Sequence, residues 1–524
     1  MKKVFLTCLI ALSFHFSVAQ RNVILIIADD LGTDYLGFYE DYQDTVDIPN
    51  LRSLAKRGVR FKNSMVNPVC SATRATLLTG RYGFRTGVGN IVGGSGGSGV
   101  IDTAEKSIPK LLKAFNPNIA KANIGKWHLN GTMPATNLQA PLKLGYDHFE
   151  GPFIGALSSY TNWTKYTNGV QSTVTTYATT ETVNNAWAWI QAQNNKPFFL
   201  WLALNAPHSP YHLPPANLHS FTGLSGTTQD IQQNPKKYFK AMLQAMDTEI
   251  GRLFDSLSVH NQLDSTDVIF IGDNGNTIQT AQITNTAKAK GTIYEYGVHT
   301  PFFIAGPSVV NGGRASDALV NGADIFATVL ELFGNMNWQT QIPANKPVDS
   351  KSLLPILKNT ATSVRDWTFC ENFKTTPDAN DGKAMRNMEY RLIKFDNGIE
   401  EFYHIASDPE ENNNLLLNPL TATELTNYNY LCTEMTNLVG TGNYCNPSVG
   451  ITEMQAHLPH ISPNPFHDFI RLQNFPATKE AKLYDTMGKL LYQGNALATQ
   501  NFAHLAKGIY LLTIENQIFK LLKD

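Results

Sequence analysis

Four uninterrupted apolar runs constrain the fold of this chain more than any other feature of its sequence. They occupy residues 21–30, 197–204, 267–275 and 300–306. A strand with one face in water alternates apolar and polar residues, so runs without alternation predict strands buried on both faces. Helical patterns lie between or after them, at residues 103–115, 179–193, 235–257 and 322–334. Strands that alternate with helices predict an α/β fold, a sheet flanked by helices, with ligands beyond the carboxyl ends of the strands.

The sequence pattern changes after about residue 355, which predicts further structural units. An antiparallel hairpin at 389–405 and a helix near 421–439 indicate a smaller α+β subdomain. Short strands in a small all-β sandwich are then expected at 469–473, 481–494, 501–505 and 508–524, with turns at Gly488 and 515–516. The expected units are a signal peptide (1–19), a main α/β domain (20–355), the smaller subdomain (356–450), a Pro- and Asn-rich linker (451–462) and the all-β module (463–524).

The first 19 residues have the composition of a secretory signal peptide. Lys2 and Lys3 precede an apolar stretch, residues 4–16, that is too short to cross a bilayer, and Ser17-Val18-Ala19 forms a small-residue cleavage site. No later run is long and apolar enough for a membrane helix, so we expect an exported chain without a membrane span.

The net charge argues against a nucleic-acid-binding protein, and three of the cysteines need an explanation. The formal net charge is -1 at pH 7, so no overall positive field attracts nucleic acid or anionic lipid, although local cations could still bind an anionic substrate. Cys432 and Cys445 are close enough in sequence for a local disulfide, but spacing leaves the pairing open. Cys70 stands alone at a predicted helix start, and Arg74 follows it.

Acidic and amide side chains follow two of the apolar runs. Asp29 and Asp30 end the first run, and Asp273 and Asn274 end the third. Four hard oxygen ligands of this kind suit Ca²⁺ or Mg²⁺ rather than zinc, which prefers His or Cys. Helix capping or loop solvation is the alternative interpretation of such residues.

Four further side chains could carry chemistry. Lys126 and His128 alternate on a segment expected to be extended, so both should point into one pocket. His208 lies between prolines after a buried run, and Lys290 lies in the segment 289–299. Taken singly, each could equally be a surface lysine or a structurally bonded histidine.

Together these residues resemble the sulfatase family of the alkaline phosphatase superfamily. That family has a Cys-x-Pro-Ser-Arg signature followed by a helix ending in Thr-Gly-Arg. Here the sequence reads Cys70-Ser71-Ala72-Thr73-Arg74 and then Leu78-Thr79-Gly80-Arg81. Asp-Asp, Gly-Lys-Trp-His, Ala-Pro-His-x-Pro, Asp-Asn-Gly, Lys-Gly-x-x-Tyr-Glu and Asp-Pro-x-Glu-x-x-Asn-Leu elements occur in family order between about residues 22 and 440. The resemblance implies an alkaline-phosphatase-like mixed sheet and a sulfuric ester hydrolase.

The resemblance also implies a modified nucleophile and a metal. Cys70 would be oxidised by a separate maturation enzyme to formylglycine (3-oxoalanine), whose hydrated form attacks the sulfur of a sulfate ester. The metal, Ca²⁺ with Mg²⁺ as the alternative, would be held by Asp29, Asp30, Cys70, Asp273 and Asn274.

The remaining roles carry over by resemblance to matching positions. Arg74 would hydrogen-bond the nucleophile, and Lys126 and Lys290 would bind sulfate oxygens. His208 would protonate the departing alcohol, and His128 would take a proton from the nucleophile so that sulfate is expelled.

The chain departs from the family pattern at four positions. Ala72 and Thr73 replace the usual Pro-Ser, which resembles substrates of radical-type bacterial maturation enzymes. Tyr296 stands where Gly is common, and His299 stands where Arg is frequent. The last two follow Lys290 in the same segment.

Residues 463–524 resemble the type A C-terminal sorting domain of type IX secretion, with a carbohydrate-binding module as the alternative. Secretion or cell-surface display through the periplasm is therefore expected, with the secretion machinery as a partner. A sulfated polysaccharide or oligosaccharide is the expected substrate. The alternative functions are a phosphodiester or phosphonate monoester hydrolase of the same superfamily and an inactive sulfated-glycan binder.

Overall fold

The computed structural model describes residues 21–39, 42, 44–93, 97–440, 442, 444–446, 460–473, 480–514 and 517–524. The expected signal peptide and most of the expected linker lie outside these residues. The chain divides into two compact units. The first runs to Leu415 and includes Asn427–Tyr444, and the second comprises Leu416–Thr426 and Cys445–Asp524.

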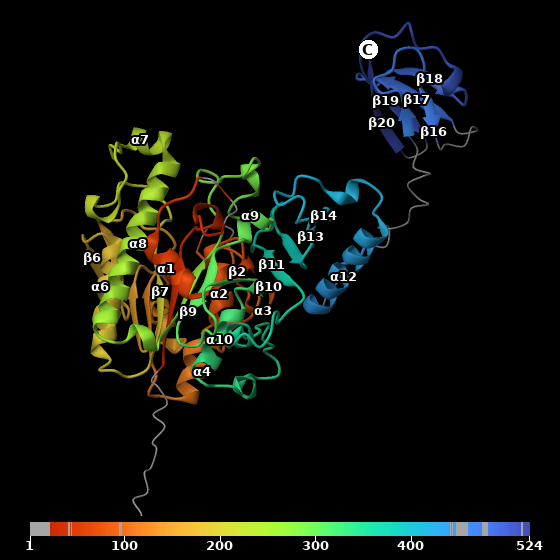
Figure 1. Ribbon diagram of the computed structural model, residues 1–524. Coiled ribbons are helices and arrows are strands. Elements are labelled where there is room, and N and C mark those ends of the chain that lie inside the picture. The colour runs from red at the N-terminus through yellow and green to blue at the C-terminus, as the bar shows by residue number, and fades with distance from the viewer. Residues whose placement is uncertain are drawn as a thin grey trace, which may run out of the picture. The chain divides into compact units, whose positions relative to one another are not determined.

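A mixed sheet forms the centre of the first unit (Figure 1). It has ten strands, in the order β10-β2-β9-β8-β1-β7-β3-β4-β5-β6. The strands are β1 (Asn22–Ala28), β2 (Gly58–Met65), β3 (Ala120–Gly125), β4 (His148–Gly151), β5 (Trp163–Thr167), β6 (Val170–Val174), β7 (Phe198–Ala203), β8 (Thr266–Gly272), β9 (Phe302–Ala305) and β10 (Arg314–Asn321). The four apolar runs form β1, β7, β8 and β9, and β1 pairs in parallel with both β7 and β8. The predicted α/β class is thereby confirmed.

Helices cover both faces of this sheet because the residues of a strand point alternately to opposite sides. Ile24 and Ile26 pack in one core with α1, α6 and α8, whereas Leu25 and Ile27 pack in a second core with α2, α4 and α10. The helices are α1 (Pro49–Arg57), α2 (Cys70–Thr79), α3 (Gly83–Thr86), α4 (Ile108–Phe115), α5 (Ala140–Lys143), α6 (Ala178–Ala192), α7 (Thr228–Gln233), α8 (Pro235–Val259), α9 (Glu295–Val298), α10 (Asp324–Leu332), α11 (Leu354–Leu357) and α12 (Ala422–Val439).

The predicted helix at 103–115 begins later than expected, at Ile108. Ser107 caps it by accepting a hydrogen bond from the Lys110 amide, and Pro109 occupies its first turn. Both features are typical of a helix start, so the preceding residues stay outside the helix.

A second, antiparallel sheet completes the first unit, in the order β11-β12-β13-β14. Its strands are β11 (Thr368–Asn372), β12 (Gly382–Arg386), β13 (Tyr390–Phe395) and β14 (Glu400–His404), and β13 and β14 form the predicted hairpin. Buried ion pairs join this sheet to α9. Glu295 at the start of α9 pairs with Arg386 and with Arg391 at 2.7 Å, and Arg391 lies 3.2 Å from Glu411.

The second unit carries the C-terminal strands. They are β15 (His460–Ser462), β16 (Arg471–Gln473), β17 (Ala481–Asp485), β18 (Leu490–Gly494), β19 (Gly508–Ile514) and β20 (Gln517–Lys523). β15 and β16 pair with each other, and the other four form an antiparallel sheet in the order β18-β17-β19-β20. The prediction of a strand at 501–505 is wrong, because this segment forms a turn. Phe502 nevertheless lies in the core of the module.

The cysteines and the helices add two findings. Cys432 and Cys445 are both disulfide-bonded, whereas Cys70 and Cys370 are buried free thiols. Among the described residues, no helix has the length and apolar character needed to cross a bilayer.

Arg391→Met should lower the free energy of unfolding of the first unit by about 3–5 kcal/mol, because it leaves the buried Glu295 and Glu411 carboxylates without their shared cation. Urea unfolding followed by tryptophan fluorescence measures this, since every tryptophan lies in the first unit. Arg52→Met is the matched control. Its ion pair with Asp47 is exposed, so the loss should stay below about 1 kcal/mol. Equal losses in the two variants would contradict the prediction.

Candidate active site

Two adjacent parallel strands bring the acidic side chains together. Ala28 of β1 pairs with Gly272 of β8, so the residues that follow them meet at one edge of the sheet. The Asp30 amide donates to Asp273 Oδ1 at 3.1 Å, and Asn274 Nδ2 donates to Asp30 Oδ1 at 2.8 Å. All four of the expected ligands, Asp29, Asp30, Asp273 and Asn274, are buried.

Helix α2 contributes a thiol and a cation to the same place. Cys70 is its first residue, and Arg74 lies one turn later. The Arg74 guanidinium donates to Asp273 Oδ2 through Nε at 3.1 Å and Nη2 at 2.8 Å. The substituted Thr73 keeps a structural role, because its hydroxyl donates to the Asn67 carbonyl and accepts from the Asn67 amide. This holds the loop that enters the helix.

Lys126 and His128 reach the site, but not by the alternation expected of an extended segment. β3 ends at Gly125, and His128 has a left-handed backbone with φ of 57°. Lys126 Nζ lies 2.5 Å from Asp29 Oδ2, and His128 Nδ1 lies 3.1 Å from Cys70 Sγ. Positive φ at Gly125 and His128 interrupts the expected extended backbone, yet both side chains reach one site as predicted.

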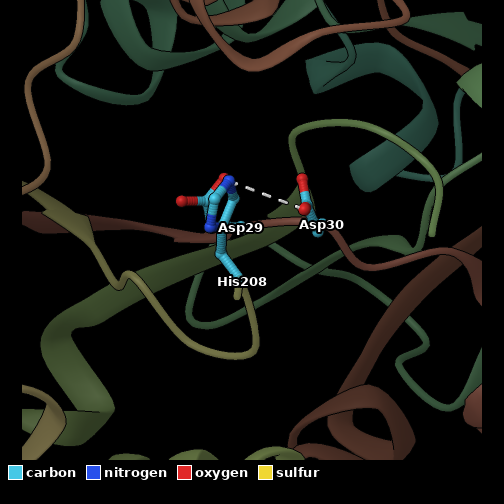
Figure 2. Close-up of side chains that lie close together, drawn as sticks. All are labelled: Asp29, Asp30 and His208. Carbon is cyan, nitrogen blue, oxygen red and sulfur yellow. Dashed lines mark ion pairs between the residues drawn. The ribbon is translucent and has the colours of Figure 1, made fainter. Parts of the chain in front are cut away.

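His208 and Lys290 approach the acidic cluster from two other loops. Figure 2 shows His208 directed toward Asp30, with its Nε2 3.7 Å from Asp30 Oδ2. Its Nδ1 lies 2.6 Å from the Ser209 carbonyl, so this contact orients the ring. Lys290 Nζ pairs directly with Asp30 Oδ1. All of the expected site residues are thus brought together, Lys290 included.

Burial and nearby charges shift the pKa values of two carboxyl groups in the cluster, those of Asp30 and Asp273. Burial alone would raise the pKa of the Asp30 carboxyl, but Lys290 and His208 hold that pKa well below its usual range. Burial together with Asp29 raises the pKa of Asp273 despite the opposing charge of Arg74.

The pKa of the His128 imidazole shifts downward, whereas pairing with a carboxylate would raise the pKa of a histidine. Burial, with Lys126 and Arg74, lowers the pKa of His128 well below its usual value. This imidazole is therefore neutral at pH 7 and is able to accept a proton.

The donor set fits a hard divalent cation. Asp29 Oδ1, Asp30 Oδ2 and Asn274 Oδ1 are buried and have no hydrogen-bond partner among the described residues. Unpartnered buried oxygens are costly, and a cation would satisfy all three at once. Two sets of side chains each have candidate ligand atoms within 4.8 Å of one another. One set is Asp29, Cys70 and Asp273, and the other is Asp29, Asp30 and His208.

A second group of polar residues beneath the site was not found from the sequence. Tyr296 donates its hydroxyl to Asp34 Oδ2, and Asn276 Nδ2 donates to Asp34 Oδ1. Asn276 also accepts from the Gly32 amide at 3.1 Å, and its carbonyl accepts from the Lys290 amide at 2.9 Å. This network joins the loop after β1 to the segment that carries Lys290. The only signal was the presence of Tyr296 where the family commonly has Gly.

Tyr160 was likewise missed as a single residue. Its hydroxyl lies 2.8 Å from the Asn205 carbonyl and 2.7 Å from the His208 carbonyl. It therefore fixes the backbone of the loop that presents His208. The segment that carries it, residues 151–178, is rich in aromatic and hydroxyl residues, but this composition does not single out Tyr160.

Family comparisons cover nearly the whole described chain. Residues 21–335 match the family described as Sulfatase, and residues 288–437 match the family described as N-sulphoglucosamine sulphohydrolase, C-terminal. Residues 460–523 match the family described as Secretion system C-terminal sorting domain.

Known proteins agree with these matches. The chain is 28% identical to N-acetylgalactosamine-6-sulfatase from Homo sapiens over 74% of this chain and 80% of the relative. The structure of Ps i-CgsB in complex with k-i-k-neocarrahexaose is similar, with a TM-score of 0.65, 25% identity, and coverage of 83% of this chain and 96% of that one. The fold is also that of BT4656 in complex with its substrate D-glucosamine-2-N,6-O-disulfate, with a TM-score of 0.62, 20% identity, and coverage of 83% and 100%.

Tyr296→Phe should lower the free energy of unfolding by about 1–3 kcal/mol, because it removes the hydroxyl partner of the buried Asp34 carboxylate. Hydrogen exchange should also become faster at the Lys290 amide, which the same network holds through Asn276.

Tyr166→Phe is the matched control for this change. Its hydroxyl donates to Gln171 at the exposed β5–β6 hairpin, so it should alter neither quantity by much. A Tyr296→Phe variant with unchanged stability and unchanged exchange at Lys290 would contradict the role of the network.

Proposed function

The chain belongs to the sulfatase family, and we propose that it is a secreted, metal-dependent enzyme that releases inorganic sulfate from a sulfated polysaccharide or oligosaccharide. The observation that carries this proposal is the setting of Cys70. It begins α2 beside three buried carboxylates, and two lysines and two histidines reach the same cluster. The nucleophile, the anion-binding groups and the proton-transfer groups of a sulfate ester hydrolase are all represented there.

Cys70 is proposed to act after oxidation to formylglycine by a separate maturation enzyme. In that change water replaces the sulfur, which leaves as hydrogen sulfide, and an oxidant supplied by the maturation enzyme takes up two electrons and two protons, so –CH₂SH becomes –CHO. Hydration of the aldehyde supplies two hydroxyls, one of which is the nucleophile toward sulfur. The N-terminus of α2 favours the negative charge that develops at this position.

Asp29, Asp30, Asp273 and Asn274, with the modified Cys70, would hold the cation, for which Ca²⁺ is proposed and Mg²⁺ is the alternative. A bound divalent cation supplies Lewis-acid stabilisation of the attacking and sulfate oxygens. Ion pairs with Asp29 and Asp30 place the ammonium groups of Lys126 and Lys290 at the cluster. There they are proposed to bind the sulfate oxygens as well. Arg74 holds Asp273 and is proposed to hydrogen-bond the nucleophile.

The two histidines divide the proton transfers. His208 is the more exposed of the two, and it is proposed to protonate the departing alcohol. His128 lies against Cys70 and is neutral, so it is proposed to take the proton of the second hydroxyl, which expels sulfate and restores the aldehyde.

The substrate class rests on the relatives and on the C-terminal module. The relatives are named for sulfated amino sugars and for a carrageenan oligosaccharide. The sorting-domain match supports export by type IX secretion to the medium or the cell surface, where sulfated polymers are met.

Oxidation should be confined to Cys70. A mass spectrum of tryptic peptide Asn63–Arg74 from protein made in a native-like host should show the aldehyde in place of the thiol. Cys70→Ala should abolish sulfate release, whereas Cys370→Ala should retain it, because Cys370 is a buried thiol on β11.

The outcomes of this experiment separate the alternatives. An unmodified Cys70 and no turnover would favour the inactive glycan binder. Faster turnover of bis(4-nitrophenyl) phosphate than of 4-nitrophenyl sulfate would favour the phosphodiesterase. Sulfate release from chondroitin 6-sulfate, ι-carrageenan or fucoidan supports the polysaccharide assignment, and activity on aryl sulfates alone counts against it.

Removal of divalent cations should lower both activity and thermal stability. At a hundred-fold excess of Ca²⁺ over its Kd, bound cation should add about 2.7 kcal/mol, seen as a rise in Tm over the EDTA-treated protein. Asp273→Asn should lose most of that rise, and Asp47→Asn, an exposed carboxylate, should keep it. The same Tm with and without Ca²⁺ and Mg²⁺ would contradict the metal site.

A further inference from the structure

A cavity of about 780 Å³ lies against the outer edge of the ten-stranded sheet. Three parts of the first unit enclose it, namely the edge strand β10, the segment 359–366 after α11, and the β12–β13 turn together with α12. Its volume is within the range of about 300–1,000 Å³ that is usual for ligand pockets. None of its lining residues belongs to the candidate active site.

The sheet itself separates this cavity from the active site. β10 is three strand positions from β8 and four from β1, which corresponds to about 14 and 19 Å at the usual strand spacing. The lining covers residues 314–319, the first part of β10, whereas the catalytic cluster follows the last residues of β1 and β8. The two places are distinct, although one extended chain could reach both.

The cavity presents polar groups that the protein leaves unpaired. Arg314 has no ion pair among the described residues, although its Nη2 donates to the backbone carbonyls of Ile356 and Leu357 and its Nε is buried. The side chains of Asp366 and Glu389 line the cavity and likewise show no ion pair or hydrogen bond within the described chain. Tyr430 of α12 is 36% exposed and Met388 is 47% exposed, so an aromatic and an apolar surface are open beside them.

The charges of the lining favour a neutral ligand over an anionic one. Arg365 is neutralised by Asp324, and Asp317 is paired with Lys62. One arginine and two carboxylates remain, so no positive excess is available for a sulfate group. Sugar hydroxyls donate hydrogen bonds, and the unpaired carboxylates of Asp366 and Glu389 are acceptors for them. An exposed tyrosine ring offers the apolar contact that a sugar face requires.

Addition of a peptide strand to β10 fits the same cavity less well. The register of β10 shifts between Ser316 and Leu319, which interrupts the regular edge. Arg314 and Asp317 also place charges on this strand. Bulges and charged side chains are the features by which edge strands avoid pairing.

We propose that this cavity is a second carbohydrate-binding site, which takes an unsulfated stretch of the polysaccharide chain. The proposal rests on the proposed function only in that the substrate is a polysaccharide. The site would keep a long chain on the enzyme between successive sulfate removals, and it would not contribute to the hydrolysis of small aryl sulfates.

Affinity electrophoresis of the full chain tests the proposal, in gels that contain agarose, unsulfated chondroitin or chemically desulfated fucoidan. We expect at least one polymer to retard the wild type, and we expect Tyr430→Ala and Asp366→Ala to weaken that binding at least fivefold. Phe115→Ala, an aromatic that is 42% exposed at the end of α4, is the matched control and should bind as the wild type does. Hydrogen exchange at residues 314–319 should slow when the polymer is added.

Turnover of 4-nitrophenyl sulfate keeps the two proposals separate. It should be unchanged in Tyr430→Ala, Asp366→Ala and Phe115→Ala. The wild type and all variants could fail to hydrolyse a sulfate ester while Tyr430→Ala still binds the polymer more weakly than the wild type. In that case the proposed function fails and the second site stands. Retardation by none of the three polymers, or equal retardation of wild type, Tyr430→Ala and Asp366→Ala, overturns the second site. Protection of residues 314–319 by an extended peptide and by none of the polymers also overturns it, in favour of strand addition.

Discussion

The buried charge balance at the ends of β1 and β8 is the constraint on which the rest of the structure depends. Asp29, Asp30 and Asp273 lie at the carboxyl ends of adjacent strands and are almost fully buried. Buried carboxylates this close together are unfavourable unless cations accompany them. The chain supplies one from each of three separate segments, and the unpartnered oxygens that remain fit a divalent cation.

The smaller subdomain takes part in this balance through α9. Lys290 must approach Asp30, and the segment that carries it ends in Glu295, which Arg386 and Arg391 hold through buried ion pairs. The second sheet therefore acts as a support for the site rather than as a separate module. The network of Asp34, Asn276 and Tyr296 supports the same segment through separate hydrogen bonds. Two independent anchors thus fix the one lysine whose sequence context departs from the family pattern.

Sequence patterns predicted the buried strands well because full burial removes polar residues from both faces. They predicted less where a local turn decides the direction of a side chain. Lys126 and His128 were expected in one pocket because an extended segment alternates its side chains. They reach the cluster although positive φ at Gly125 and His128 interrupts the extended backbone after β3. Phe502 shows the same limit in the second unit, since its burial produced a strand-like pattern although the segment is a turn.

The sequence by itself determined the α/β class, the family resemblance and the chemical types gathered at the site. Apolar runs, strand-end acids and the segment around Cys70 are local patterns that do not depend on the rest of the chain. Only the tertiary structure decided that Lys290 pairs with Asp30, that Tyr296 supports it, and that β10, the segment after α11 and α12 enclose a cavity. These contacts join residues far apart in the sequence. Such contacts depend on strand order and on the packing of the two sheets, which no local pattern specifies.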